Sequence, residues 1–151
     1  MSQDKMQIID DLILSRELCV LATSDGIEPY TSLMTYLFDH ASMKFFFLTR
    51  RDSRKSRNLR KCPHVSLLID NRDKHLPNSP DTATALTIQG VFIPIRKDQT
   101  VDAIIKRFIM KYPYIQDFAT HPDTELVRIQ ARTGLLLQGF EDKFETKFEK
   151  S

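Results

Sequence analysis

The sequence predicts a mainly β protein, a small antiparallel barrel of six to seven strands with peripheral helices. Short apolar segments typical of strands recur along the chain and are separated by turn residues. Few segments repeat apolar residues at helical spacing. The 151 residues, 41% hydrophobic and 28% charged, have the composition of an ordinary globular protein. We therefore expect residues 1–151 to form a single domain around its own core.

The first part of the chain is expected to be a helix followed by a meander of three antiparallel strands. Residues 3–16 carry apolar side chains at helical spacing. Leu18–Thr23 is an apolar strand that the turn Asp25-Gly26 closes. Glu28–Phe38 and Met43–Thr49 are the predicted second and third strands.

The rest of the chain is expected to add two strands, an amphipathic helix with a further helical turn, and a final hairpin. These segments are Val65–Asp70, Ala83–Ile95, Val101–Met110, Tyr114–Ala119, and Leu126–Gln130 paired with Leu135–Phe140. Gly90 inside the long strand indicates a bulge or a close backbone approach. Thr133-Gly134 is the predicted turn of the hairpin. The tail, residues 141–151, alternates charge around Phe144 and Phe148, so we expect either a mobile arm or a helix docked on a partner.

A strongly basic segment follows the aromatic third strand. Seven of the twelve residues from Arg50 to Lys61 are basic, against one acid, and Ser53 fits the N-cap of a short helix. Cys62-Pro63 should end this helix, because a residue before proline disfavours helical backbone angles. Free N–H groups at the helix start, two hydroxyls and three cations together predict a phosphate site. Its side chains are Thr49, Arg50, Ser53, Arg54 and Lys55. The alternative is a solvated basic helix, the usual meaning of an isolated charge run.

Composition argues against several other kinds of site. The net charge is only +2, so the basic segment is a local feature. Four scattered histidines lack metal-ligand spacing, and four glycines are too few for a glycine-rich nucleotide loop, so we expect no metal site. Cys19 and Cys62 are expected to be reduced structural thiols of a cytoplasmic protein. No apolar segment approaches the roughly 18 residues of a membrane span, and no membrane attachment is expected.

Four motifs in order resemble the FMN-binding split barrels related to pyridoxamine 5'-phosphate oxidase. They are Thr31-Ser32-Leu33-Met34-Thr35-Tyr36, then Phe47-Leu48-Thr49, then Ser53-Arg54-Lys55 with Asn58-Leu59, then Cys62-Pro63-His64-Val65-Ser66. The resemblance covers about residues 8–95 well and the remainder loosely. It implies a split β-barrel of the FMN-binding type, forming a homodimer with FMN in each of two clefts between subunits.

The resemblance also implies roles for individual residues. The backbone of residues 31–36 would lie along the isoalloxazine edge, and alternating Ser32, Met34 and Tyr36 would form a platform for the ring. Contacts to the ribityl-phosphate would come from Leu48 and Thr49, and phosphate contacts from Ser53, Arg54 and Lys55. It assigns no catalytic residue.

Two departures from the oxidase pattern bear on function. Thr31 and Tyr36 stand where the oxidases carry basic residues, so Arg50 or Arg51 is expected to compensate. No arginine or histidine follows Arg132, whereas the oxidases place a substrate-phosphate motif near the C-terminus. We therefore predict that this protein is not a genuine pyridoxamine 5'-phosphate oxidase, and its substrate stays unassigned.

Several functions remain open from the sequence. The first is an FMN-dependent oxidoreductase that uses a small-molecule substrate or electron donor. The second is a non-catalytic flavin-binding or sensing module on the same fold. A nucleic-acid-binding protein using the Arg50–Lys61 helix is disfavoured, because that helix lacks interleaved aromatics. A haem-binding variant lacks a persuasive axial ligand.

Overall fold

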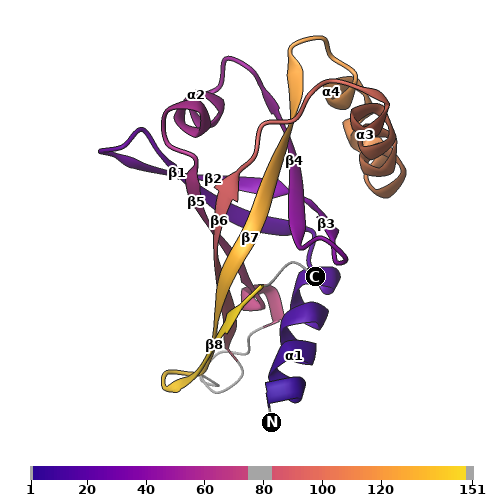
Figure 1. Cartoon of the computed structure of the whole chain (residues 1–151). Coiled ribbons are helices and arrows are strands. Elements are labelled where there is room, and N and C mark those ends of the chain that lie inside the picture. Colours follow the sequence, from indigo (N-terminus) through magenta and orange to yellow (C-terminus); the bar gives the residue numbers. More distant parts are fainter. Residues whose placement is uncertain (1, 75–82, 149–151) are drawn as a thin grey trace.

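An antiparallel sheet curls into a half-open barrel, with α1 along one end and the α3–α4 helices beside the other (Figure 1). The structure is a computed structural model that describes residues 2–74 and 83–148. The predicted mainly β split barrel is confirmed. Within the described residues the sheet has eight strands, more than the six to seven predicted.

The strands follow the order β2-β1-β5-β6-β7-β4-β3 across the sheet, and β8 pairs with β7. They are β1 (Leu18–Ser24), β2 (Pro29–Thr35), β3 (Leu37–Asp39), β4 (Lys44–Arg50), β5 (His64–Asp70), β6 (Thr84–Phe92), β7 (Thr124–Gln138) and β8 (Asp142–Lys147). The helices are α1 (Ser2–Ser15), α2 (Arg54–Lys61), α3 (Gln99–Lys111) and α4 (Gln116–Ala119), with short 3-10 turns η1 (Arg72–Lys74) and η3 (Pro113–Ile115).

The predicted second strand is divided at Tyr36, and this division curls the sheet. β2 pairs with β1, whereas β3 pairs with β4 at the opposite end of the strand order. The Tyr36 side chain is 1% exposed, and its hydroxyl donates to the carbonyl of Ile13 in α1. The predicted three-stranded meander is therefore wrong, because β4 pairs with β3 and β7 instead of with β2.

The predicted C-terminal hairpin is also wrong. Residues 124–138 form one continuous strand, β7. Gly134 lies in its middle, where a Cβ atom would come within 2.8 Å of the ring of Phe148. The glycine is therefore a packing residue, and the actual turn follows at Gly139, whose φ is +66°. The tail is neither a mobile arm nor a helix over residues 142–147, because these residues form β8 on β7.

Two apolar clusters lie on opposite faces of β4, which explains its run of aromatic residues. Phe45 and Phe47 belong to the cluster inside the barrel. Phe46 and Leu48 belong to a second cluster with α3, whose central side chain is the fully buried Phe108. Both faces of β4 are therefore covered, and the α3–α4 helices are fixed to the barrel by apolar packing.

Gly90 has the role that the sequence predicts. The pairing of β6 with β7 shifts register between Gln89 and Gly90. A Cβ at position 90 would lie 2.8 Å from the carbonyl oxygen of Gln130. The residue therefore permits a close approach between two backbones. Separately, no helix in the described part of the chain is long and apolar enough to cross a membrane.

Candidate functional site

The start of α2 has the geometry expected of an anion site. Ser53 is the N-cap, with φ −67° and ψ 155°, and its Oγ accepts a hydrogen bond from the backbone N–H of Ser56 at 3.2 Å. The Oγ1 atom of Thr49 lies 3.0 Å from the same Oγ. The helix ends at Cys62, as predicted. The end of β4 thus delivers two hydroxyls to the N-terminus of a helix, where N–H groups and the helix dipole favour an anion.

Buried polar contacts fix α2 to the barrel although the helix has little apolar surface. The amide of Asn58 donates to the hydroxyl of Thr23 on β1 at 3.2 Å, and both side chains are buried. Ser56 donates to the carboxylate of Glu125 on β7. Leu59 supplies the apolar contact, with 2% exposure. The sequence predicted only the apolar contact of Leu59. Asn58 is an uncharged polar residue among basic ones, and this was the signal that it contacts the barrel.

The two cations predicted to bind phosphate have different surroundings. Arg54 pairs with Glu28 at 3.2 Å, and its guanidinium lies 4.7 Å from the centre of the Tyr30 ring. Both charged side chains are exposed, at 44% and 71%, so this ion pair is weak. Lys55 has no hydrogen bond or ion pair within residues 2–74 and 83–148. Lys55 is therefore the cation of this group that is most available to a ligand.

Strand alternation separates Leu48 and Arg50 from the other predicted phosphate contacts. Thr49 faces Ser53, whereas Leu48 packs in the cluster with α3. The Arg50 guanidinium lies 4.7 Å from the centre of the Phe118 ring of α4, and its Nη1 is buried without a partner in the described chain. The structure thus brings Thr49, Ser53, Arg54 and Lys55 together and directs the side chains of Leu48 and Arg50 elsewhere. The second proposed replacement cation, Arg51, lies 3.9 Å from Glu125.

The prediction that Ser32, Met34 and Tyr36 form a platform for the ring is wrong, because two of these side chains are buried. Met34 and Tyr36 belong to the barrel core, with 7% and 1% exposure, because even-numbered residues of this segment face inward. The outward face of β2 carries Thr31 and Leu33 instead, and Leu33 is 69% exposed.

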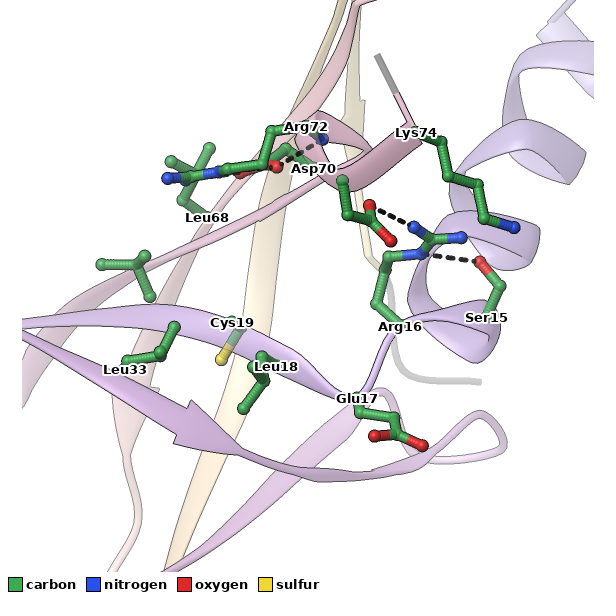
Figure 2. A pocket seen from close by; sticks show the side chains of 12 residues that line it. Ser15, Arg16, Glu17, Leu18, Cys19, Leu33, Leu68, Asp70, Arg72 and Lys74 are labelled. Carbon is green, nitrogen blue, oxygen red and sulfur yellow. Dashed lines mark hydrogen bonds and ion pairs between the residues drawn. The ribbon is translucent and has the colours of Figure 1, made fainter.

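A cavity of about 560 Å³ adjoins Leu33 on this outer face (Figure 2). Leu18, Val20 and Leu68 complete its apolar part. Charged side chains from the link between α1 and β1, from the end of β5 and from η1 form its rim, namely Arg16, Glu17, Asp70, Arg72, Asp73 and Lys74. The cavity therefore suits a ligand that is apolar on one surface and polar at its edge.

The charged rim of the cavity is tied together by ion pairs. Arg16 contacts Asp73 at 2.6 Å, and Arg72 contacts Asp70 at 2.7 Å. The hydrogen bond from Arg72 holds the pKa of Asp70 below its usual value. The side chain of Lys74 has no partner within the described residues and leaves one cation at the rim for a ligand.

An apolar row crosses the same outer face over five neighbouring strands. The strand registers place Leu33 beside Val20, then Leu68, then Thr87, then Leu135. We call these five residues the outer row. Four of the five are aliphatic, and together they form an apolar stripe that the barrel itself does not cover. Sequence reasoning missed this stripe, because apolar runs such as the first strand do not distinguish the two faces of a sheet.

The cysteines and histidines offer little further chemistry. Cys19 and Cys62 are free, as predicted. Burial raises the pKa of Cys19, beside the cavity, to about 12, so this residue stays a neutral thiol near pH 7. His40 lies 3.2 Å from Asp10. Within the described ranges, no three His, Cys, Asp or Glu side chains form a metal-binding group. The fourth histidine, His75, lies outside the described residues.

The chain resembles known proteins in sequence and fold. The family model described as pyridoxamine 5'-phosphate oxidase matches residues 7–138. A Clostridium acetobutylicum protein related to general stress protein 26, described as of the pyridoxinephosphate oxidase family, superposes with a TM-score of 0.74 at 15% identity. That alignment covers 97% of this chain and 96% of the other. No curated protein sequence matches the chain.

Two further similar structures are described as haem proteins. One is HutZ, the haem storage protein of Vibrio cholerae, with a TM-score of 0.72, 21% identity, and coverage of 88% of this chain and 93% of the other. The other is a haem-binding protein of Mycobacterium smegmatis, with a TM-score of 0.76 and 16% identity. That alignment includes 90% of this chain and 55% of the other, longer chain. At such identities these similarities describe the fold alone.

Proposed function

The chain belongs to the pyridoxamine 5'-phosphate oxidase family, and from this premise we propose that it binds FMN and acts as an FMN-dependent oxidoreductase on a small-molecule substrate. The observation that supports the proposal is the group of hydrogen-bond donors and cations at the N-terminus of α2. There the hydroxyls of Thr49 and Ser53 lie 3.0 Å apart, next to Arg54 and the unpaired Lys55. Such a group of donors matches the oxygens and the charge of a phosphate.

The donor chemistry at this position fits the phosphate of FMN. A dianion gains from the helix dipole and from the N–H groups that have no intrahelical acceptor. The acid paired with Arg54 is Glu28, which is 71% exposed and therefore well screened by water. Arg54 can exchange that weak pair for a phosphate without leaving a buried charge behind.

The outer face of β2 supports a place for the flavin ring. Leu33 adjoins the 560 Å³ cavity on this face. Tyr30, on which Arg54 stacks near the start of β2, alternates with Met34 on the opposite face, so a flavin that contacts both would pass around this edge strand. Three residues of strand span about 10 Å. β2 ends the strand order, so its outer backbone groups are free to pair with the polar edge of a ring. We therefore propose that the backbone of residues 31–36 contacts the edge of the flavin ring. The apolar surface under the ring comes from Leu33 and not from Met34 and Tyr36.

The residues named here bind and orient the cofactor. FMN, when bound, supplies the electron or hydride transfer. Arg54, Lys55 and Ser53 fix the phosphate end, and the apolar part of the cavity keeps water from one surface of the ring. No side chain is assigned as acid or base. A non-catalytic flavin-binding module remains the alternative within the same fold.

Haem is the second candidate, since two similar structures are described as haem proteins. Haem iron needs an axial His, Cys, Met or Tyr. Cys19 beside the 560 Å³ cavity is a poor ligand, because burial raises its pKa to about 12 and keeps it protonated. No histidine of the described chain lines this cavity. These observations favour FMN over haem.

We also propose a homodimer with FMN at the subunit interface. The outer row is an apolar stripe that adjoins the proposed ring position at Leu33. Contiguous exposed apolar surface of this kind is typical of protein interfaces. A second copy covering the row would shield both the stripe and one side of the flavin.

The predicted absence of genuine pyridoxamine 5'-phosphate oxidase activity stays part of the proposal. The described C-terminal residues form β8, which carries acids and lysines but no arginine or histidine. Upstream, Arg128 donates to the carbonyl of Pro94 at 2.9 Å. Oxygen consumption coupled to pyridoxal 5'-phosphate formation, at about 1 per second or faster, would contradict this part.

The spectrum of the purified protein tests the cofactor. We expect a yellow protein that releases FMN on heating, or a colourless one that binds added FMN more tightly than riboflavin. A strong haem band with no flavin would favour the haem candidate, and failure to bind either flavin would refute the proposal. Oxidation of a reduced nicotinamide by the FMN-loaded protein then separates an enzyme from a binding module.

A further inference from the structure

We infer that a second site, between the α3–α4 helices and the start of β7, binds small carboxylates with an aliphatic or aromatic body. A cavity of about 350 Å³ lies there. It shares no lining residue with the 560 Å³ cavity beside β2. Its walls come from the segment before α3, from the first turns of α3, from the turn after α4 and from β7. The inference is independent of the proposed flavin site.

The inner part of this cavity is apolar. Val101 and Leu126 are buried, and Ile95 and Ile105 are half-buried against them in the same cluster. A volume of 350 Å³ is near the lower limit of ligand cavities. It accommodates a short aliphatic or aromatic body and is too small for a nucleotide.

The rim offers three hydrogen-bond donors. Lys97 has no hydrogen bond or ion pair within the described residues. The Nδ1 atom of His121 accepts a hydrogen bond from the backbone N–H of Asp123 at 3.0 Å. The neutral imidazole therefore carries its proton on Nε2, which leaves that N–H to donate to a ligand. Arg51 is the third donor, at 3.9 Å from its weak partner Glu125.

The acids at the rim do not cancel these donors. Glu125 is already engaged by Ser56 and by Arg60, which lies 3.3 Å away and does not line the cavity. Asp102 lies in the first turn of α3, where the helix dipole favours a carboxylate. The lining holds two cations, Arg51 and Lys97, and two acids, Asp102 and Glu125. Because Glu125 is engaged by Ser56 and Arg60, the donors at the rim are more available to an anionic head group than the acids are to a cationic one.

Protein NMR tests the site with three matched probes: hexanoate, hexylamine and hexan-1-ol. We expect hexanoate to shift the backbone amides of residues 95–105 and 119–126 saturably in the millimolar range. Hexylamine and the alcohol should bind at least about tenfold more weakly, because they lack the charge-assisted bonds. Equal shifts with all three probes, or shifts confined to other residues, would overturn the inference.

Two variants and a control localise the binding. Lys97→Gln should weaken hexanoate binding about three- to tenfold, and His121→Phe should do the same through loss of the Nε2–H donor. Lys106→Gln, on the exposed surface of α3 away from the cavity lining, should leave the affinity unchanged. If all three variants retain the wild-type affinity, the carboxylate does not bind through these donors, and the inference fails.

Discussion

The side chains of Lys55 and Arg54 differ in their partners within the protein. This difference decides which of the two substitutions gives the clearer test of phosphate binding. Arg54 has a partner in Glu28 and an aromatic neighbour in Tyr30. Lys55 has no partner in the described chain. Substituting Lys55 therefore removes the proposed phosphate contact without breaking an interaction of its side chain within the described protein.

Lys55→Ala should weaken FMN binding about ten- to a hundredfold, since a charge-assisted hydrogen bond contributes roughly 1.5–3 kcal/mol. Riboflavin lacks the phosphate and should be affected far less. Titration of both flavins into the flavin-free protein measures the two affinities. Lys61→Ala, at the other end of α2, is the control and should leave FMN affinity nearly unchanged. Equal losses for FMN and riboflavin would contradict the phosphate assignment.

Asp70 should contribute to stability at neutral pH but not in strong acid. The hydrogen bond from Arg72 holds the folded-state pKa of Asp70 below the unfolded value of about 3.9. The stabilisation is therefore present above that unfolded pKa and is lost as the pH falls through the folded pKa. Arg72 is 70% exposed, so water screens the pair and its contribution to stability is small.

Urea unfolding of Asp70→Asn at pH 7 and pH 2.5 tests this dependence. The variant should be less stable than the wild type at pH 7, and the difference should shrink at pH 2.5. Asp52→Asn, at an exposed turn position, is the control. A difference that stays constant or grows towards low pH would show that the pair has no such role.

At the scale of elements, glycines determine how β7 packs against its neighbours. A side chain at position 90 would meet the backbone carbonyl of Gln130. One at position 134 would meet the ring of Phe148 at 2.8 and 3.0 Å. Backbone in the middle of a sheet cannot move aside, whereas the atoms of Phe148 that a new Cβ would meet are the far end of a side chain, which can turn about its own bonds.

Gly90→Ala should therefore destabilise the protein by about 1–3 kcal/mol, the usual range for overpacking a core. Gly134→Ala should cost less, because the Phe148 ring adjusts. Chemical denaturation of both variants compares their free energies of unfolding. A Gly134→Ala loss equal to or larger than that of Gly90→Ala would show that the ring is as rigid as the backbone.

At the scale of the whole molecule, the barrel leaves one apolar stripe uncovered. The division at Tyr36 curls the sheet so that Met34 and Phe45 face inward, while the outer row faces away from the core. The opposite flank of the barrel is already covered by α3, which packs on β4. The outer row is therefore the surface that we propose a second copy covers.

Leu33→Asp should convert the proposed homodimer into a monomer, because a charge buried in an apolar interface is costly to desolvate. Size-exclusion chromatography with light scattering gives the mass in solution. Met110→Asp is the matched control: it changes a residue that is 82% exposed on α3, outside the outer row, and should leave the dimer intact. A monomeric wild type would refute the homodimer, and a dimeric Leu33→Asp variant would place the interface elsewhere.

Local signals in the sequence predicted most of the elements and the residues of the proposed phosphate site. Ser53 and Pro63 mark the ends of α2, because an N-cap hydroxyl and a proline act on neighbouring backbone whatever the fold. Alternation and turn residues likewise identify most of the strands, and the bulge at Gly90 follows from one glycine in a long strand.

Only the tertiary structure decided which face of each strand packs in the core, which packs against a helix and which stays open. The apolar runs of β1 and β4 do not distinguish a face covered by the core from one covered by a helix or left open. A glycine is compatible with a turn and with a packed strand, and only the packing of Phe148 against Gly134 distinguishes the two. Both cavities, the outer row and the orientation of Arg50 depend on contacts between residues far apart in the chain, so no local pattern encodes them.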